Sequence, residues 1–232
     1  MSKTKQSDSK TTISLSSGRI EKIEPGCKTQ PLKMEPSKKR FVSLVVLVLL
    51  SLSVSAAGGA IDYLSVPGPI SITQLNYNLA WSSHPKDNFY VQEYVPAGET
   101  PEHYSNMILL QVFIGSKSAK DVVGALVKII EERGRTDPIV HHELFQSAAG
   151  KDEYLIDFLQ SEGPAAEVVE WNAYHYKTFT DKSGRTGVLL FGISRRAYGE
   201  QVRPFLIGLK TERIKLRNAL SAHPFPEIRI KQ

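Results

Sequence analysis

The segment Val140-His141-His142-Glu143 carries the residue types best suited to chemistry in this chain. Successive side chains of an extended segment point to opposite faces, so His141 and Glu143 share one face. His175, on a neighbouring predicted strand, would complete two imidazoles and one carboxylate, a ligand set suited to zinc. That set needs a strand register that the sequence does not fix. The alternative is that His141 and Glu143 face solvent while His142 forms local hydrogen bonds, in which case no metal or other cofactor is expected.

Aromatic side chains crowd one predicted strand, which contains Trp171, Tyr174, Tyr176 and Phe179. Alternation places Trp171 and Phe179 on one face and the two tyrosines on the other. We expect Trp171 to lie in the core. We expect Tyr174 and Tyr176 to be exposed, where large aromatic groups often contact a partner or a small ligand.

Charged residues offer two further candidates. Arg195 and Arg196, together with Arg185, could hold an acidic group of a partner. Several carboxylates could supply a general acid and a general base, although solvated surface positions are the simpler interpretation. These acids are Glu93, Glu131, Glu132, Asp152, Glu153 and Asp157.

Common catalytic signatures are absent from the sequence. It contains no G-x-S-x-G elbow, no G-x-x-x-x-G-K-[ST] phosphate loop, no G-x-G-x-x-G fingerprint, no C-x-x-C and no H-E-x-x-H. The familiar nucleotide-binding, thiol and zincin classes are therefore excluded. The sequence indicates no catalytic residue and favours a protein without enzymatic activity.

The elements that would position these residues follow from hydrophobic periodicity. The run 107–114 is apolar on both faces, which predicts a strand in the middle of a sheet covered on both sides. A capping pattern from Ser118 to Asp121 starts a helix that ends before Gly134, and 203–222 has a second amphipathic pattern. The order is βββαββββα, which predicts an α+β fold: a twisted antiparallel sheet of about six or seven strands packed with two main helices. The predicted strands are 77–81, 89–95, 107–114, 139–146, 153–160, 168–179 and 188–196.

One apolar run, residues 41–57, follows the basic triplet Lys38-Lys39-Arg40 and contains no charge. Extended to residue 61, it reaches the length that just spans a bilayer, and a backbone in hydrocarbon must be helical. The fold is therefore expected to be preceded by one hydrophobic membrane or signal helix. Side chains expected to meet lipid include Phe41, Val45, Leu49, Leu50 and Val54.

Two interpretations of this run remain open. In the first, residues 1–40 are a cytoplasmic tail and residues 41–61 are a signal anchor oriented by the positive charge. In the second, translation starts at Met34 rather than Met1, and a signal peptide is cleaved near Ala56 or Ala57. Both place the remainder outside the cytoplasm, either on the inner membrane or released into the periplasm or medium.

Charge and composition divide the chain. Residues 1–40 hold ten Lys or Arg and four Asp or Glu, and the remainder holds nineteen and twenty, so the basic charge belongs to the leader and no nucleic-acid partner is expected. The leader is too polar to form a core and is expected to be disordered. Its Cys27 is the only cysteine in the chain, so an exported domain would contain no disulfide.

We expect a Pro/Gly stem at 62–74, a domain at 75–223 and a C-terminal tail at 224–232.

The element order over most of residues 75–222 resembles that of PsbP, the extrinsic protein of the oxygen-evolving photosystem, and its bacterial PsbP-like relatives. This resemblance implies an exported or membrane-associated accessory protein that supports a partner without catalysis. The overall plan of tail, span and periplasmic α+β domain is also similar to assembly-factor subunits of type IV secretion and conjugation machines. Those domains begin with helices, whereas strands come first here.

The sequence thus predicts a non-enzymatic envelope protein, membrane-anchored or secreted, whose extracytoplasmic domain binds a protein partner or supports a membrane complex. The alternative is a small-ligand-binding protein or an unclassified hydrolase that uses the aromatic strand with His141 and His175.

Overall fold

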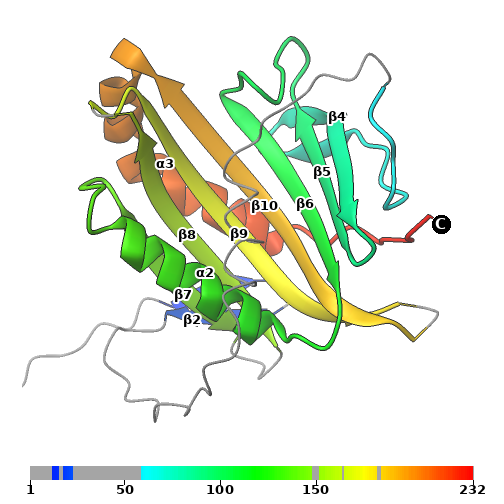
Figure 1. The fold of residues 1–232 in the computed structure, drawn as a ribbon. Coiled ribbons are helices and arrows are strands. Elements are labelled where there is room, and N and C mark those ends of the chain that lie inside the picture. Colours follow the sequence, from blue (N-terminus) through cyan, green and yellow to red (C-terminus); the bar gives the residue numbers. More distant parts are fainter. Residues whose placement is uncertain are drawn as a thin grey trace, which may run out of the picture.

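The computed structural model describes residues 59–147, 152–163, 165–181 and 184–231, together with the backbone of 12–15 and 18–22. A mostly antiparallel, strongly curled sheet carries one helix on each face (Figure 1). The strand order across the sheet is β1-β2-β7-β8-β9-β10-β6-β5-β4-β3.

From residue 75 onward the elements follow the predicted order of three strands, a helix, four strands and a helix. The sheet has more strands than the six or seven predicted, because β3 and the leader strands β1 and β2 extend its two edges. The strands are β1 (Thr12–Leu15), β2 (Gly18–Lys22), β3 (Ile70–Ile72), β4 (Leu75–Lys86), β5 (Phe89–Val95), β6 (Asn106–Ile114), β7 (His141–Ser147), β8 (Glu153–Glu162), β9 (Val168–Thr180) and β10 (Thr186–Tyr198). The helices are α2 (Ala119–Arg133), the short η1 (Gly199–Gln201) and α3 (Val202–Ala222).

The expected membrane or signal helix at residues 41–61 lies almost entirely outside the described residues. Within the part that the structure describes, no helix has both the length and the apolar character needed to cross a bilayer.

The centre of the sheet consists of β9, β10 and β6, which are buried on both faces. Strands β9 and β10 are each 13 residues long and pair along their whole length, from Thr180 opposite Thr186 to Val168 opposite Tyr198. β6 lies next to β10, and its residues 107–110 are all buried, as its continuous apolar pattern predicts. These strands therefore carry buried side chains on either face.

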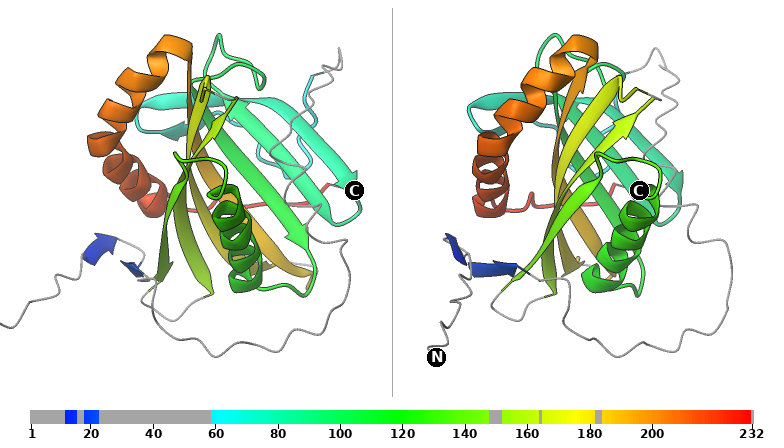
Figure 2. Two further views of the ribbon diagram at one scale, coloured as in Figure 1. Left: turned by 60° about the vertical axis from the view of Figure 1, so that its left-hand side comes forward. Right: turned by 90° about the vertical axis from the view of Figure 1, so that its left-hand side faces the viewer.

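Helix α2 covers the concave face of the curled sheet (Figure 2). Its start is a capping box in which Ser118 and Asp121 exchange side-chain and backbone hydrogen bonds, as the sequence predicts. Its apolar stripe packs on β8 and β9, and this contact buries both Tyr174 and Tyr176. The expectation that these two tyrosines are exposed is therefore wrong, because the face opposite Trp171 is also covered. Trp171 itself is buried, as expected.

Helix α3 packs on the opposite, convex face (Figure 2). Leu209 and Leu220 enter the core beside Trp171. Arg217 belongs to the polar side of the amphipathic pattern at 203–222, which would normally face solvent. It is instead buried, and its Nη1 lies 3.0 Å from Asp157 Oδ2 and 2.8 Å from Glu143 Oε2. The guanidinium also stacks on the Phe145 ring, with 4.2 Å between its carbon and the ring centroid.

The segments predicted to be a stem and a tail belong to the folded domain. Leu64 is completely buried and donates its backbone N–H to Gln92 Oε1 over 2.8 Å. The backbone N–H of Arg229 donates to the carbonyl of Leu64 and that of Lys231 to the carbonyl of Tyr63, each over 2.9 Å. The stem prediction failed because Pro67, Gly68 and Pro69 interrupt a segment whose flanking apolar residues are core.

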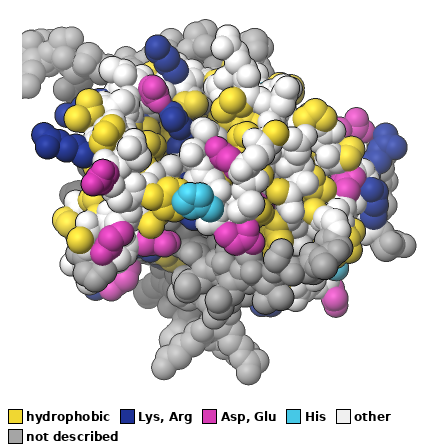
Figure 3. Space-filling model, turned by 90° about the horizontal axis from the view of Figure 1, so that it is seen from above, with side chains coloured by type: hydrophobic (Ala, Val, Ile, Leu, Met, Phe, Trp, Pro, Cys, Tyr) yellow, Lys and Arg dark blue, Asp and Glu magenta, His cyan; other side chains and the backbone are white. Residues whose placement is uncertain are grey.

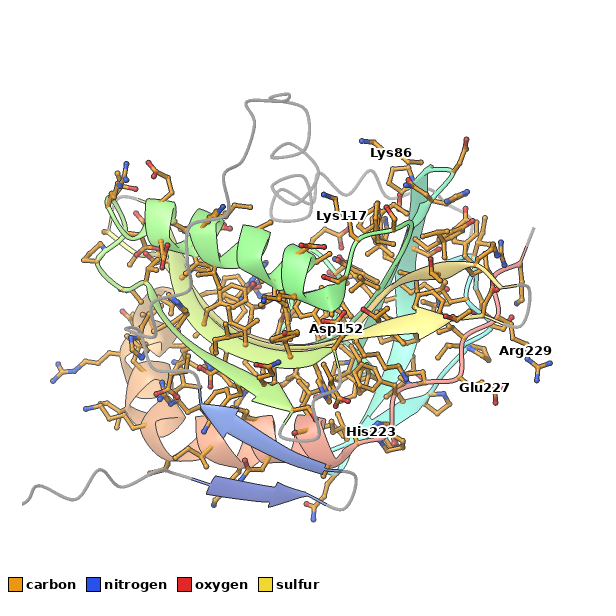
Figure 4. The ribbon with its side chains drawn as sticks, turned by 90° about the horizontal axis from the view of Figure 1, so that it is seen from below. Lys86, Lys117, Asp152, His223, Glu227 and Arg229 are labelled. Atoms are coloured by element: carbon orange, nitrogen blue, oxygen red, sulfur yellow. The ribbon has the colours of Figure 1, made fainter. Side chains whose placement is uncertain are left out.

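Part of the leader also has structure. β2 pairs antiparallel with the edge of β7, with Ile20 opposite Ser147 and Lys22 opposite Phe145. The expectation of a disordered leader is therefore wrong for β1 and β2, which lie beside α3 (Figure 4). This pairing requires residues 18–22 and the domain to be on the same side of any membrane.

Candidate functional site

The structure does not assemble the zinc site considered for His141, Glu143 and His175. Strand β8 separates β7 from β9, with His141 opposite Leu159 and His175 opposite Leu155. The two histidines are therefore two strands apart and offset by four residues. Glu143 forms ion pairs with Arg213 and Arg217 instead. No group of three potential ligands from His, Cys, Asp and Glu occurs among the residues with described side chains.

His175 lines a different feature, an open hollow of about 480 Å³ between the sheet and the end of α3. Two sides of this hollow can be followed in Figure 4, which labels Asp152 at the sheet and His223 just after α3. The sheet contributes residues of β8 and β9, and α3 with the segment that follows it contributes the rest. The lining residues are Asp152, Glu153, His175, Lys177, Thr178, Ser221, His223, Pro224 and Phe225.

Two buried polar atoms at this hollow have no hydrogen-bond partner among the described residues. They are Nδ1 of His175 and Oγ of Ser221, whose residues are 2% and 4% exposed. The other ring nitrogen of His175, Nε2, lies 2.7 Å from Glu153 Oε1. Buried polar atoms are nearly always paired, and these two, unlike the other unpaired atoms of the described residues, belong to side chains that line a hollow, where a bound molecule could satisfy them.

Lys177 adds a positive charge beside His175 on the same face of β9. Its Nζ lies 4.3 Å from the centroid of the Phe225 ring, and that ring lies 4.4 Å from the His175 ring. Burial lowers the pKa of the Lys177 ammonium, and the Glu153 carboxylate on the adjacent strand opposes part of this shift. Phe225 therefore packs against both polar side chains and forms the apolar wall of the hollow.

Asp152 connects the hollow to helix α2. Its carboxylate accepts the backbone N–H groups of Ala119 over 2.8 Å and Lys120 over 3.1 Å, and it also accepts the Thr178 hydroxyl. Asp152 thus supplies negative charge at the N-terminus of α2, where a helix favours it. Asp152 is half-buried and hydrogen-bonded rather than simply solvated as expected, because β8 begins directly under the start of this helix.

Comparison with known proteins places these residues within one family. A protein-family model matches residues 64–225, which is more than half of the chain and includes every residue that lines the hollow. The chain belongs to that family. Searches of curated proteins and of solved structures find no match.

Sequence reasoning missed most of the hollow. Ser221 is more than forty residues from His175 in the chain, and only the packing of α3 on the sheet brings them to the same place. The alternation of β9 does place His175 and Lys177 on one face, and this was the one signal available.

Arg195 and Arg196 do not act together, because adjacent strand residues face opposite sides of the sheet. Arg195 pairs with Glu212 of α3 on the convex face. Arg196 donates from Nε to Glu170 Oε2 over 2.6 Å and stacks on the Tyr104 ring at 4.3 Å. Both guanidinium groups therefore have carboxylate partners within the domain.

The concave face holds a second group of polar residues, around Glu170. The Tyr104 hydroxyl donates to Glu170 Oε2 over 2.7 Å, on the same oxygen that Arg196 contacts. Glu93 lies nearby and is 5% exposed, so it is not the solvated acid that was expected. Burial raises the pKa of Glu93 to about 7, with Arg196 lowering it and Glu170 raising it further.

The raised pKa of Glu93 predicts how the stability of the domain depends on pH. The native pKa of Glu93 is about 7, against an ordinary value of 4.5, so the native state binds its proton more tightly than the unfolded state. The stability that this proton contributes is complete below about pH 4.5 and is lost as the pH rises through 7. Glu93→Gln should therefore reduce the fall in unfolding free energy between pH 5 and pH 8, by up to about 3 kcal/mol.

Urea unfolding at both pH values measures this difference. Glu131→Gln, at an exposed position of α2, is the matched control and should keep the pH dependence of the unchanged protein. An identical pH dependence in Glu93→Gln and the unchanged protein would show that Glu93 titrates normally.

Proposed function

We propose that the folded domain, residues 61–231, is a binding domain that holds a small polar ligand in the hollow beside His175. The observation that carries this proposal is the pair of buried, unpaired atoms, His175 Nδ1 and Ser221 Oγ, at one open hollow. A bound molecule with hydrogen-bonding groups would satisfy both, and leaving such groups unpaired costs roughly 1–3 kcal/mol each.

The geometry favours binding over catalysis. Ser221, His175 and Glu153 are the residue types of a hydrolytic triad, but Ser221 Oγ has no hydrogen bond to His175. Ser221 also lies in the last turn of α3, where the helix dipole is negative. A developing oxyanion would be destabilised there, whereas a neutral hydroxyl is not.

A thiol at position 221 tests this proposal. In full-length Cys27→Ser/Ser221→Cys protein in detergent, the small reagent methyl methanethiosulfonate should reach the thiol through the open hollow and react with it, more slowly than with an exposed thiol. At least one compound class among sugars, amino acids, hydroxy acids and nucleosides should slow this reaction at least tenfold, because a ligand in the hollow shields the sulfur. The variant Cys27→Ser/Ala222→Cys, one residue away on the exposed side, is the control and should react at an unchanged rate. Equal rates with every class would contradict the proposal.

We propose further that residues 41–57 carry this domain out of the cytoplasm. They act either as a signal anchor in a chain translated from Met1 or as part of a cleaved signal peptide in a chain translated from Met34. The absence of charge in this run and the basic residues before it support export. A span would place residues 18–22 across the membrane from β7, and cleavage near Ala56 would remove them. Export and the pairing of β2 with β7 therefore exclude one another in the same molecule.

Cross-linking in intact cells distinguishes the two states. Glu21 lies opposite Gln146 in the β2–β7 pairing, so Glu21→Cys/Gln146→Cys should be joined by a short thiol cross-linker only where β2 occupies the edge. We expect no cross-link in cells, because export separates the two strands. The control pair Ser65→Cys/Arg229→Cys should cross-link, since the Ser65 hydroxyl donates to the Arg229 carbonyl over 2.9 Å. All variants also carry Cys27→Ser. An efficient Glu21–Gln146 cross-link would overturn export.

A protein partner is the second candidate, in line with the accessory role that the PsbP-like resemblance implies. Ile207 and Ile214 of α3 are 61% and 47% exposed and lie on the same side of the helix, one above the other. Exposed aliphatic side chains on the outward face of a helix suit contact with another protein.

This candidate predicts a loss of association. If α3 binds a partner, affinity purification of the intact protein from solubilised membranes should recover a stoichiometric protein. Ile207→Glu/Ile214→Glu should lower that recovery at least tenfold, while Lys215→Glu, further round the helix, should leave it unchanged. Recovery of the protein alone, or equal recovery with the double variant, would argue against a partner on this face.

A further inference from the structure

We propose that the ligand of the hollow is a small monovalent carboxylic acid that also carries hydroxyl groups. Its carboxylate would contact Lys177, and its hydroxyl groups would contact His175 and Ser221. This inference rests on the proposed function and specifies its substrate class.

The hydrogen bond between His175 Nε2 and Glu153 determines whether the other ring nitrogen, Nδ1, donates or accepts a hydrogen bond. Glu153 as a carboxylate offers only acceptors, so His175 Nε2, 2.7 Å away, carries the proton of that bond. In the neutral ring Nδ1 is then an acceptor, and it has no donor among the described residues. A ligand hydroxyl supplies such a donor, whereas a carboxylate oxygen does not.

Lys177 and Ser221 supply the complementary groups. The Lys177 ammonium packs on the Phe225 ring at 4.3 Å and is partly withdrawn from water. The Ser221 hydroxyl is buried and can donate a hydrogen bond. The ammonium of Lys177 suits an anionic oxygen, because charge-assisted hydrogen bonds are the stronger kind, whereas the Ser221 hydroxyl at the negative end of α3 suits a neutral ligand oxygen.

The charges around the hollow limit the ligand to one negative charge. Asp152 and Glu153 place two carboxylates beside the single ammonium of Lys177. A phosphate dianion would meet these carboxylates with only one cation to offset them, and like charges at close range are unfavourable. A single carboxylate meets half of this repulsion, and the charge of Asp152 is already offset by the backbone N–H groups of Ala119 and Lys120 at the start of α2.

The shape and lining of the hollow indicate what the rest of the ligand is like. Phe225 and Pro224 present an apolar wall that suits a carbon chain or the C–H face of a polyol. A volume of about 480 Å³ lies in the lower half of the range of ligand sites, about 300–1,000 Å³, and leaves ample room for a six-carbon chain. A hydroxylated acid of this size would fit in the hollow and satisfy the buried atoms.

Three compounds with six-carbon chains test the proposal by isothermal titration of the full-length protein in detergent. Gluconate has both the carboxylate and the hydroxyl groups, hexanoate has only the carboxylate, and sorbitol has only hydroxyl groups. We expect gluconate to bind at least tenfold more tightly than either of the others. Equal or tighter binding of hexanoate or sorbitol would overturn the proposed class, and so would a failure of all three to bind.

Single substitutions test which residues of the hollow contact gluconate. Lys177→Gln should weaken gluconate binding at least tenfold and Ser221→Ala about threefold or more, while Lys210→Gln, exposed on α3, should leave it unchanged. Unchanged binding in both hollow variants would place the ligand elsewhere and overturn the proposal. If gluconate fails but another class protects the thiol of Ser221→Cys, only the ligand class is wrong. If no class protects it, the hollow is not a binding site.

Discussion

The buried ion pair between Arg217 of α3 and Asp157 of β8 fixes where the helix sits on the sheet. Burial raises the pKa of Asp157 in spite of the nearby Arg217 and Arg213, which shows how strongly the site disfavours an uncompensated charge. Such pairs add little net stability over apolar residues, but removing one partner typically costs about 3–5 kcal/mol. A rotation of α3 would have the same effect, so the pair selects one orientation of the helix. That orientation brings Ser221 to the hollow, one turn further along.

Strand β9 distributes its side chains between two unlike environments. Tyr174 and Tyr176 point under α2, while His175 and Lys177 point toward the end of α3. One face is therefore aromatic and closed, and the other is polar and open at the end of the helix. On the surface seen from above in Figure 3, acidic, basic and apolar side chains are mixed and no single charge dominates.

Much of the secondary structure could be predicted from the sequence, because it depends on local signals. The capping pair Ser118 and Asp121, the two-sided apolar run of β6 and the alternation of β9 each act within a few residues. The burial of Tyr174, Arg217 and Glu93 could not be predicted, because it depends on which helix covers which face. Charged residues were assigned to solvent by their type, and only their partners across the fold explain why they are inside. The zinc hypothesis failed for a related reason: sequence alternation gives the face of a side chain but not the number of strands between two of them.

The beginning and the end of the folded domain are joined side by side. Lys231 donates its backbone N–H to Tyr63 over 2.9 Å, and its ammonium pairs with Asp62 at the same distance. A short peptide could therefore link residue 231 to residue 61 without disturbing a strand. The turn at Asp87 between β4 and β5 is exposed and could serve as the new opening. The folded domain is therefore suited to circular permutation, because its two ends lie side by side. Its architecture does not depend on where the chain of the domain begins.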